Sequence, residues 1–358
     1  MNSFTNLDRT LGNQPRELGV ALARLDVGKG REELYRNQLP ELLTQLAEQS
    51  RIHSITASSA IEGVVVSGER GEGIAVGRVQ PPMFRNRNER EFAGYRDALD
   101  EIVRSDGNGT LTMAHILHLH RVLFSYTDAP GGTLKTEQNY IADETPGDGR
   151  QIVFEPPSPQ LTPSLLDNLI WWYEKSAAES AGHPMLLISA FVLDFLSIHP
   201  FEDGNGRVAR LLTAQLLLRA GYGVSRYVSI EQLIYENKNH YYDSLRESSD
   251  GWHDGTHSVW PWASFLVQTL VLAYDAFEER VAAARGPERM GKGQRVGEYV
   301  LNRAPATFSL ADIRRALPGV STPTIHLALR DLKKRKLVEL VSVGRTAQYR
   351  RANHVGNV

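Results

Sequence analysis

The chain of 358 residues contains no cysteine. This absence excludes disulfide bonds, a thiolate nucleophile and any zinc site built from cysteine. Long apolar runs are also missing: no run of apolar residues approaches the roughly 18 that a membrane helix needs. The first nine residues lack the apolar core of a signal peptide. We therefore expect a cytoplasmic protein with no membrane partner.

Charge is distributed unevenly along the chain. The whole chain has a net charge of −2, with 41% hydrophobic and 23% charged residues, which is ordinary for a globular protein. Residues 292–358 contain four lysines and nine arginines against two aspartates and two glutamates, a surplus of nine positive charges. The first 291 residues therefore have a net charge of −11. This asymmetry predicts that a basic C-terminal domain follows an acidic body.

The most informative stretch is 199–210, which reads His-Pro-Phe-Glu-Asp-Gly-Asn-Gly-Arg-Val-Ala-Arg. Apolar runs at 184–198 and 211–220 flank it, so the pattern predicts two buried helices joined by a loop that carries the chemical groups. His199 ends the first helix and has the ordinary pKa of a general base at neutral pH. Gly204 and Gly206 allow successive N–H groups to point inward at a helix N-terminus, which binds phosphate.

Three charged side chains extend this interpretation. Arg207 and Arg210 are three residues apart, so on a helix they are neighbours on one face and can grip phosphate oxygens. Asp203 supplies only one carboxylate, which is not enough for a metal site built entirely from protein ligands. One carboxylate is sufficient for Mg²⁺ that takes its other ligands from phosphates and water. The alternative interpretation is a plain turn between helices with solvated charges.

This string resembles the signature of the Fic family, His-Pro-Phe-x-Asp/Glu-Gly-Asn-Gly-Arg-x-x-Arg, at every defined position. The resemblance implies a mainly α fold, a helical bundle with a β-hairpin flap. It also implies transfer of AMP from ATP to a Ser, Thr or Tyr hydroxyl of a target protein, with release of pyrophosphate. Family members that phosphorylate instead have Lys at the position of Gly206. The implied catalytic base is His199, and the implied nucleotide-binding residues here are Asp203 (with Mg²⁺), Gly204, Asn205, Gly206, Arg207 and Arg210.

A second resemblance lies further upstream. Apolar residues at spacings of three and four predict one helix over 31–61. Ser58, Glu62 and Gly63 at its end resemble the family's inhibitory pattern, Ser/Thr-x-x-x-Glu-Gly/Asn. The resemblance implies an inhibitory helix at about 51–62 whose Glu62 reaches Arg210. Taken by itself, the motif is equally compatible with a glutamate that has no role at a helix end.

Residues 131–142 and 151–157 are predicted to form a hairpin around the Pro/Gly/Asp turn at 146–148. The segment resembles the family's flap, which has Arg where Lys135 stands here. The resemblance implies that a target protein docks along 131–157 and places Asn139 and Tyr140 among the nucleotide-binding residues. A plain surface hairpin is the alternative.

Helices are also predicted at 91–104, 112–124, 231–245 and 260–285, with a connecting loop at 64–90. The helix at 231–245 contains Tyr242, which by resemblance lines the adenine side of the site. The helix at 112–124 contains His115, His118 and His120, but no carboxylate accompanies them at ligand spacing, so we do not favour a metal site there.

The basic domain follows a linker at 286–291. Helices are predicted at 294–302, 310–316 and 322–336, followed by a hairpin of 337–343 and 346–350 around Gly344. This order resembles a winged helix–turn–helix, which implies DNA binding through 292–358. Such modules also mediate protein contacts, and that alternative stays open.

The sequence thus predicts an N-terminal helical region (1–110), a Fic catalytic core (111–285) and a winged-helix-like domain (292–358). The leading hypothesis is a protein adenylyltransferase that uses ATP and Mg²⁺, is inhibited by Glu62, modifies itself and forms a homodimer. One alternative is removal of AMP at the same site. Another is a nucleotide-sensing DNA-binding regulator, against which His199 argues because a sensor needs no base.

Overall fold

A computed structural model describes the chain except residues 1, 6, 67, 146–148, 290, 306, 343–346 and 353–358. The chain divides into two compact units, Met1–Glu278 and Glu279–Val358. The predicted N-terminal region and most of the predicted catalytic core lie together in the first unit. None of the helices in the described part combines the length and apolar character needed to cross a bilayer.

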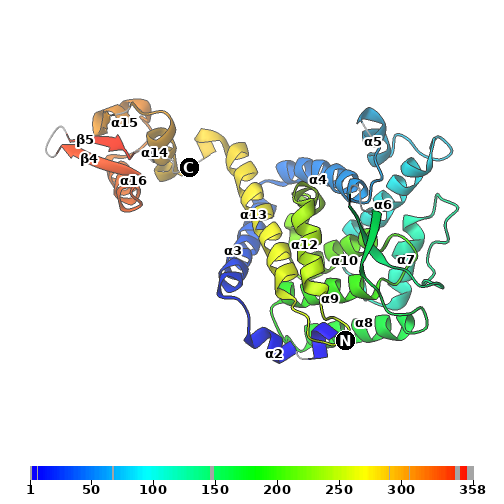
Figure 1. The fold of residues 1–358 in the computed structure, drawn as a ribbon. Coiled ribbons are helices and arrows are strands. Elements are labelled where there is room, and N and C mark those ends of the chain that lie inside the picture. The colour runs from blue at the N-terminus through cyan, green and yellow to red at the C-terminus, as the bar shows by residue number, and fades with distance from the viewer. Residues whose placement is uncertain are drawn as a thin grey trace. The chain divides into compact units, whose positions relative to one another are not determined.

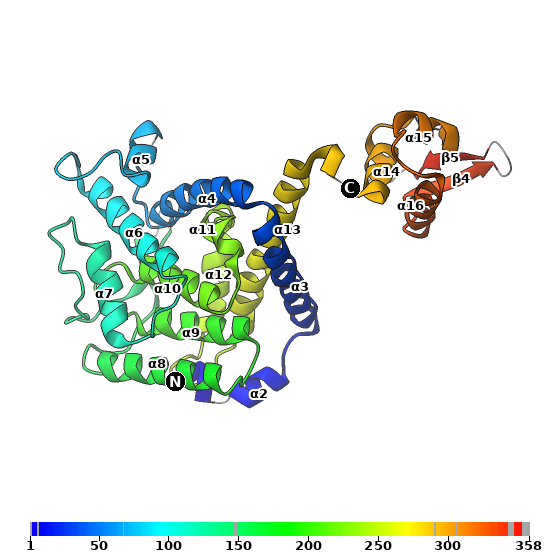
Figure 2. The same cartoon turned by 180° about the vertical axis from the view of Figure 1, so that it is seen from behind.

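The described residues of the first unit are helical apart from one hairpin (Figures 1 and 2), which confirms the predicted mainly α fold. Its helices are α1 (Asn2–Thr5), α2 (Leu7–Gly12), α3 (Arg16–Gln38), α4 (Pro40–Ile61), α5 (Gly68–Ala75), α6 (Arg87–Arg104), α7 (Met113–Leu123), α8 (Thr162–Ala178), α9 (Pro184–Ile198), α10 (Asn205–Arg219), η1 (Gly223–Arg226), α11 (Ile230–Glu236), α12 (Lys238–Ser249) and the first part of α13 (Trp260–Arg289).

Helix α9 is the centre of this unit. Every side chain from Met185 to Ile198 except that of Leu196 is buried, as expected for a helix that is apolar on all faces. Helices α8 and α10 pack on either side of it, as Figure 1 shows. The loop that follows α9 therefore starts from a rigid support.

The predicted single helix over 31–61 is wrong, because α3 ends at Gln38 and α4 begins at Pro40. Proline has no N–H to donate, and its ring disfavours helical geometry in the residue before it. Leu39 accordingly has φ −138° and ψ 50°. The break makes α4 a separate helix, and its last turn carries Ser58.

Three other boundaries differ from expectation. The predicted loop at 64–90 contains α5, and the predicted helix at 231–245 is divided into α11 and α12. Asn237 causes this division, since its backbone leaves helical geometry and its side chain donates to the carbonyl of Leu233 (2.9 Å). Helix α13 continues through Gly286 and Pro287 to Arg289, where a linker was expected.

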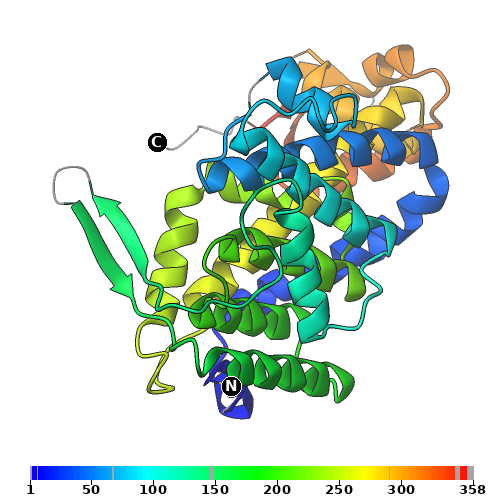
Figure 3. The same ribbon diagram turned by 90° about the vertical axis from the view of Figure 1, so that its right-hand side faces the viewer.

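The flap is an antiparallel hairpin of β1 (Ile141–Thr145) and β2 (Gly149–Phe154) that projects beside α12 in Figure 3. Ile141 pairs with Phe154, and Thr145 pairs with Gly149. The strands are shorter than the predicted arms, because the chain before Ile141 is irregular. The predicted turn at 146–148 lies outside the described residues.

The second unit contains the predicted helices α14 (Lys292–Asn302), α15 (Leu310–Ala316) and α16 (Thr322–Lys334) and the predicted strands β4 (Val338–Ser342) and β5 (Gln348–Arg351). A short strand that was not predicted, β3 (Thr307–Ser309), completes an antiparallel sheet of order β3-β5-β4. Gly344 lies outside the described residues. Val296, Phe308, Ile325 and Val338 are central to the apolar core of this unit.

Candidate active site

His199 stands at the C-terminal end of α9 in the left-handed conformation, with φ 49°. Its Nδ1 lies 3.1 Å from the carbonyl oxygen of Leu196. A carbonyl can only accept, so Nδ1 carries the hydrogen and Nε2 has the free lone pair. Burial lowers the pKa of His199 to about 4, although the bond to Leu196 acts in the opposite direction. The imidazole is therefore neutral at pH 7 and can accept a proton.

Two asparagines hold the loop after His199. Asn205 is buried, its Oδ1 accepts from the N–H of Phe201 (2.9 Å), and its Nδ2 donates to the Phe201 carbonyl (2.8 Å). Asn139 donates from Nδ2 to the carbonyls of His199 (3.1 Å) and Phe201 (2.9 Å). Both side chains serve the loop, so nucleotide binding by these residues stays a prediction; for Asn205 the backbone N–H is the available donor.

Helix α10 begins directly after this loop and has open amide groups. Gly204 precedes it with φ 85°, and a Cβ there would lie 2.9 Å from the ring of Phe124. In the described part of the chain, the N–H groups of Asn205, Gly206 and Arg207 have no backbone acceptor. Open N–H groups at the positive end of a helix attract anions. The geometry expected of a phosphate cradle is thus present.

Asp203 lies beside this cradle, with 56% of its side chain exposed. Its Oδ1 accepts from the N–H of Gly204 (2.6 Å) and from Arg207 (3.2 Å), and its Oδ2 faces Arg87 (3.4 Å). An exposed carboxylate next to a phosphate cradle fits Mg²⁺ that takes its other ligands from phosphate and water. Among the described residues, no group of three His, Asp or Glu side chains could hold a metal by itself.

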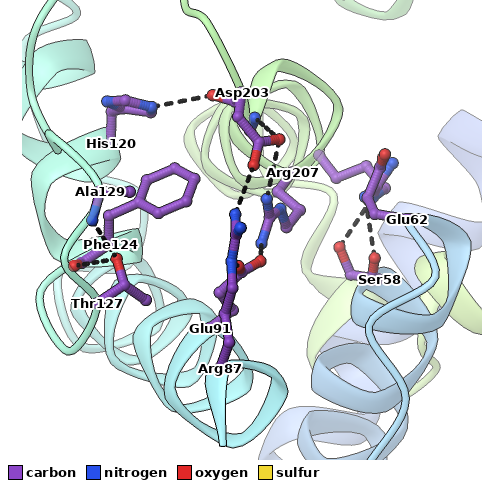
Figure 4. A network of polar contacts seen from close by, with 12 residues as sticks. Ser58, Glu62, Arg87, Glu91, His120, Phe124, Thr127, Ala129, Asp203 and Arg207 are labelled. Atoms are coloured by element: carbon purple, nitrogen blue, oxygen red, sulfur yellow. Dashed lines mark hydrogen bonds and ion pairs between the residues drawn. The ribbon is translucent and has the colours of Figure 1, made fainter.

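Arg207 is almost completely buried and is bound by protein carboxylates (Figure 4). Its Nη1 donates to Glu91 of α6 (2.5 Å), and its Nη2 donates to Asp203. The guanidinium also lies 5.2 Å from the ring centre of Phe124. Sequence reasoning missed Glu91, whose side chain is only 4% exposed. This ion pair fixes the first turn of α10 against α6.

Arg210 extends in a different direction, toward α4. Its Nε donates to Ser58 Oγ (2.8 Å), and its Nη2 donates to the Ser58 carbonyl (3.0 Å) and to Glu62 Oε1 (2.9 Å). The expected shared grip of Arg207 and Arg210 is therefore absent from this structure. The two side chains diverge because their carboxylate partners lie on different helices.

Glu62 lies over the first turn of α10. A Cβ on Gly206 would be 2.3 Å from Glu62 Oε1, so the carboxylate rests where any larger residue at position 206 would collide with it. Gly63, with φ 76°, follows α4 in a conformation that suits glycine. Lys238 of α12 donates to the carbonyl of Ile61 (2.7 Å) and thereby anchors the end of α4. Sequence reasoning missed this lysine.

His120 has a role that the sequence did not reveal. Its Nδ1 accepts from the N–H of Gly132 (2.8 Å), so its Nε2 carries the hydrogen and donates to the Asp203 carbonyl (3.0 Å). The ring stacks on Phe201 at 3.8 Å, and burial lowers the pKa of His120 to about 4. His120 thus joins the base of the flap to the loop that carries Asp203. His115 and His118 pair with other partners, Gln215 and Glu101 respectively.

A pocket of about 530 Å³ opens beside these groups. Its lining includes Glu62, His199 and Gly206, together with residues of α9, α12 and the flap. Tyr241 and Tyr242 both line it, but Tyr241 is 3% exposed and Tyr242 is 40% exposed. Tyr242 is therefore the more accessible of the two rings, and its contact with adenine stays a prediction. Asn239, which the sequence did not single out, also lines the pocket, whereas Tyr140 is exposed and does not.

Comparisons with known proteins found similarity to one protein family. The model of the Fic/DOC family matches residues 110–217. The chain is 27% identical over 212 residues to the protein adenylyltransferase Fic of Aedes aegypti, a match that covers 58% of this chain and 39% of that protein. With its counterpart from Drosophila virilis it is 34% identical over 113 residues, which is 31% of this chain and 21% of that protein. The chain thus spans well under half the length of these curated relatives.

A solved structure of a Fic family protein from Desulfovibrio desulfuricans has the same fold. Its TM-score is 0.60 at 21% identity, and the match covers 97% of this chain and 98% of that chain. At this identity, the similarity shows the fold alone.

Proposed function

We propose that this protein is an adenylyltransferase, because the model of the Fic/DOC family matches residues 110–217. It transfers AMP from ATP to Ser, Thr or Tyr hydroxyls of target proteins, and to hydroxyls of its own chain. The observation that carries the proposal is the state of His199. Its Nδ1–H donates to the Leu196 carbonyl, so Nε2 keeps a free lone pair that can accept a proton. His199 also lines the pocket.

The reaction follows from these groups. His199 Nε2 takes the proton of the target hydroxyl, whose oxygen forms a bond to the α-phosphorus of ATP. The bond between that phosphorus and the bridging oxygen breaks, and pyrophosphate leaves with the electron pair. The open N–H groups of Asn205, Gly206 and Arg207 hold the phosphate oxygens during this step.

Asp203 is the residue that would hold Mg²⁺. When bound, this ion would neutralise charge on the phosphates. Arg207 and His120 keep the Asp203 region in position, through its carboxylate and its carbonyl respectively. We infer that catalysis rests on positioning and charge stabilisation.

The flap suits the docking of an extended target segment. Strand β2 lines the pocket with Val153 and Phe154, and Ile141 of β1 lies on the same wall. A segment paired with the edge of this hairpin would bring its hydroxyl toward His199. Backbone pairing tolerates different side chains, which suits transfer to several targets.

The test is incubation of the full chain with Mg²⁺ and ATP labelled at the α-phosphate, followed by mass spectrometry of the protein. We expect the mass of one AMP group to be gained on a hydroxyl residue. His199→Ala should abolish this gain while ATP binding persists, because the base contacts the target and not the phosphates. His118→Ala, a change at an exposed histidine paired with Glu101, is the matched control. A gain at the parental rate in His199→Ala would contradict the assignment.

Removal of AMP is the second candidate for the same site. Glu62 lines the pocket together with His199, so its carboxylate could align a water molecule for attack on a modified hydroxyl. The two candidates differ in their response to Glu62→Gln, which should abolish removal of AMP. Measurement of AMP release from a modified target decides between them.

For the second unit we propose DNA binding through α16. Arg330, Lys333 and Lys334 are exposed on this helix and have no carboxylate partner among the described residues. Three unpaired cations suit the phosphates of a major groove. Fluorescence anisotropy with a short labelled duplex should show binding that weakens with salt, with Arg330→Ala weaker than the parent. Arg335→Ala removes a cation already close to Asp331 (3.7 Å) and is the control.

A further inference from the structure

A second cavity, of about 320 Å³, lies between α4, α10 and α11. We call it the α4–α10 pocket. It shares no lining residue with the pocket that contains His199. Its walls are mainly apolar, and the residues that matter below are Glu48, Arg51, Ala214, Leu217, Glu231 and Ile234. A cavity of this size and composition is suited to a small organic molecule.

The charges in this pocket are not balanced. Three arginines line it, and each is already paired: Arg51 with Asp100 (2.5 Å), Arg210 with Glu62 (2.9 Å) and Arg226 with Asp106. Glu48 and Glu231, in contrast, have no ion pair among the described residues. An unoccupied α4–α10 pocket is therefore acidic, which favours a cation.

Glu231 is the more informative carboxylate, because it is only 6% exposed. Its Oε1 accepts from the hydroxyl of Tyr95 at 3.4 Å, and its Oε2 accepts from Ser229 Oγ at 3.3 Å. Both distances are long for bonds from a hydroxyl. A carboxylate can accept about four hydrogen bonds, and burial with few strong donors is costly. Glu231 thus retains capacity for a donor that enters the pocket.

We propose that the α4–α10 pocket binds a small organic cation, an ammonium group on an apolar body. The ammonium donates to Glu231, and the apolar body lies against Leu217 and Ile234. A phosphate-bearing ligand does not suit the pocket, because its uncompensated charges are negative. The site thus differs from the nucleotide site in chemistry, although Arg210 belongs to both.

A ligand here would also affect α4. Arg51 lines the pocket and belongs to the helix that ends before Glu62, and Arg210, the partner of Ser58 and Glu62, lines the pocket as well. A ligand that fits the pocket as it stands binds the docked position of α4 most tightly, so it must shift the equilibrium toward that position. Hydrogen exchange of the last turn of α4 should therefore slow when the ligand binds.

The experiment uses the full chain and isothermal calorimetry with three probes of similar size: phenethylamine, 2-phenylethanol and 3-phenylpropanoate. We expect phenethylamine to bind with a dissociation constant on the order of a millimolar, and the neutral and anionic probes to bind at least tenfold more weakly. Glu231→Gln preserves shape and should remove the preference for the amine. Ala214→Trp should fill the pocket and abolish binding.

Two results would overturn the proposal: equal binding of the three probes, or full affinity in Ala214→Trp. If Glu231→Gln does not fold, the probe selectivity of the unchanged chain and the Ala214→Trp result still decide. Binding that leaves hydrogen exchange in α4 unchanged would refute the effect on α4. None of these measurements depends on AMP transfer, so failure of the proposed function and failure of this site are distinguishable.

Discussion

Replacement of Glu62 by glycine is the change with the clearest expected effect on activity. Glu62 Oε1 accepts from Arg210 Nη2 at 2.9 Å, and the two side chains are 31% and 3% exposed. Glycine should be tolerated at this position, because Glu62 is the C-cap residue that follows α4 and does not lie inside the helix. The substitution removes the carboxylate over the first turn of α10 and leaves the two bonds from Arg210 to Ser58 intact.

The magnitude follows from the pair that is lost. A charge-assisted bond at a mostly buried arginine is worth on the order of 1.5–3 kcal/mol. We propose that Arg210 also binds ATP phosphates, so that the Glu62 carboxylate competes with them for the same guanidinium. Its removal should therefore lower the barrier to AMP transfer by up to that amount, which corresponds to about ten- to a hundredfold in rate. Folding should change little.

The assay is the initial rate of labelled AMP incorporation by parent and variant at identical ATP and Mg²⁺ concentrations. Glu179→Gly is the matched control, because Glu179 is an exposed glutamate that also caps a helix, α8. We expect the control to react at the parental rate. A Glu62→Gly variant that is folded, binds ATP and reacts no faster than the parent would refute inhibition by Glu62.

Further predictions concern the base, a buried ion pair and the second unit. Since burial lowers the pKa of His199 to about 4, the base stays neutral well below pH 6.5, so kcat/KM should hold down to about pH 5; a midpoint near 6.5 would contradict this. Glu91→Gln should lower the free energy of unfolding by about 3 kcal/mol, because it leaves the buried Arg207 charge poorly compensated. Urea unfolding measures this, and Glu174→Gln, at the more exposed pair with Arg219, should cost under about 1 kcal/mol. Deletion of 292–358 should leave self-modification intact, because the site residues lie in the first unit; a folded but inactive 1–291 fragment would disprove that independence.

Local features of this protein were determined by the sequence itself. Helix α9 has the predicted bounds, because its residues are apolar on all faces, Pro184 suits a helix start and His199 leaves helical geometry. The glycine before α10 and the open N–H groups after it also follow from neighbouring residues alone. The break at Pro40 is equally local, and we missed it by giving apolar spacing more weight than proline.

The tertiary structure decided which side chains meet. Arg207 binds Glu91 across 116 positions of sequence, and Arg210 binds Glu62 across 148. A helical spacing of three predicts that both arginines lie on one face. Helix packing places their carboxylate partners on two different sides of α10, so the two arginine side chains diverge. The roles of His120 and Lys238 are likewise absent from any local pattern, because their acceptors are backbone carbonyls of distant segments. Every residue has such a carbonyl, so only the packed fold determines which one a side chain reaches.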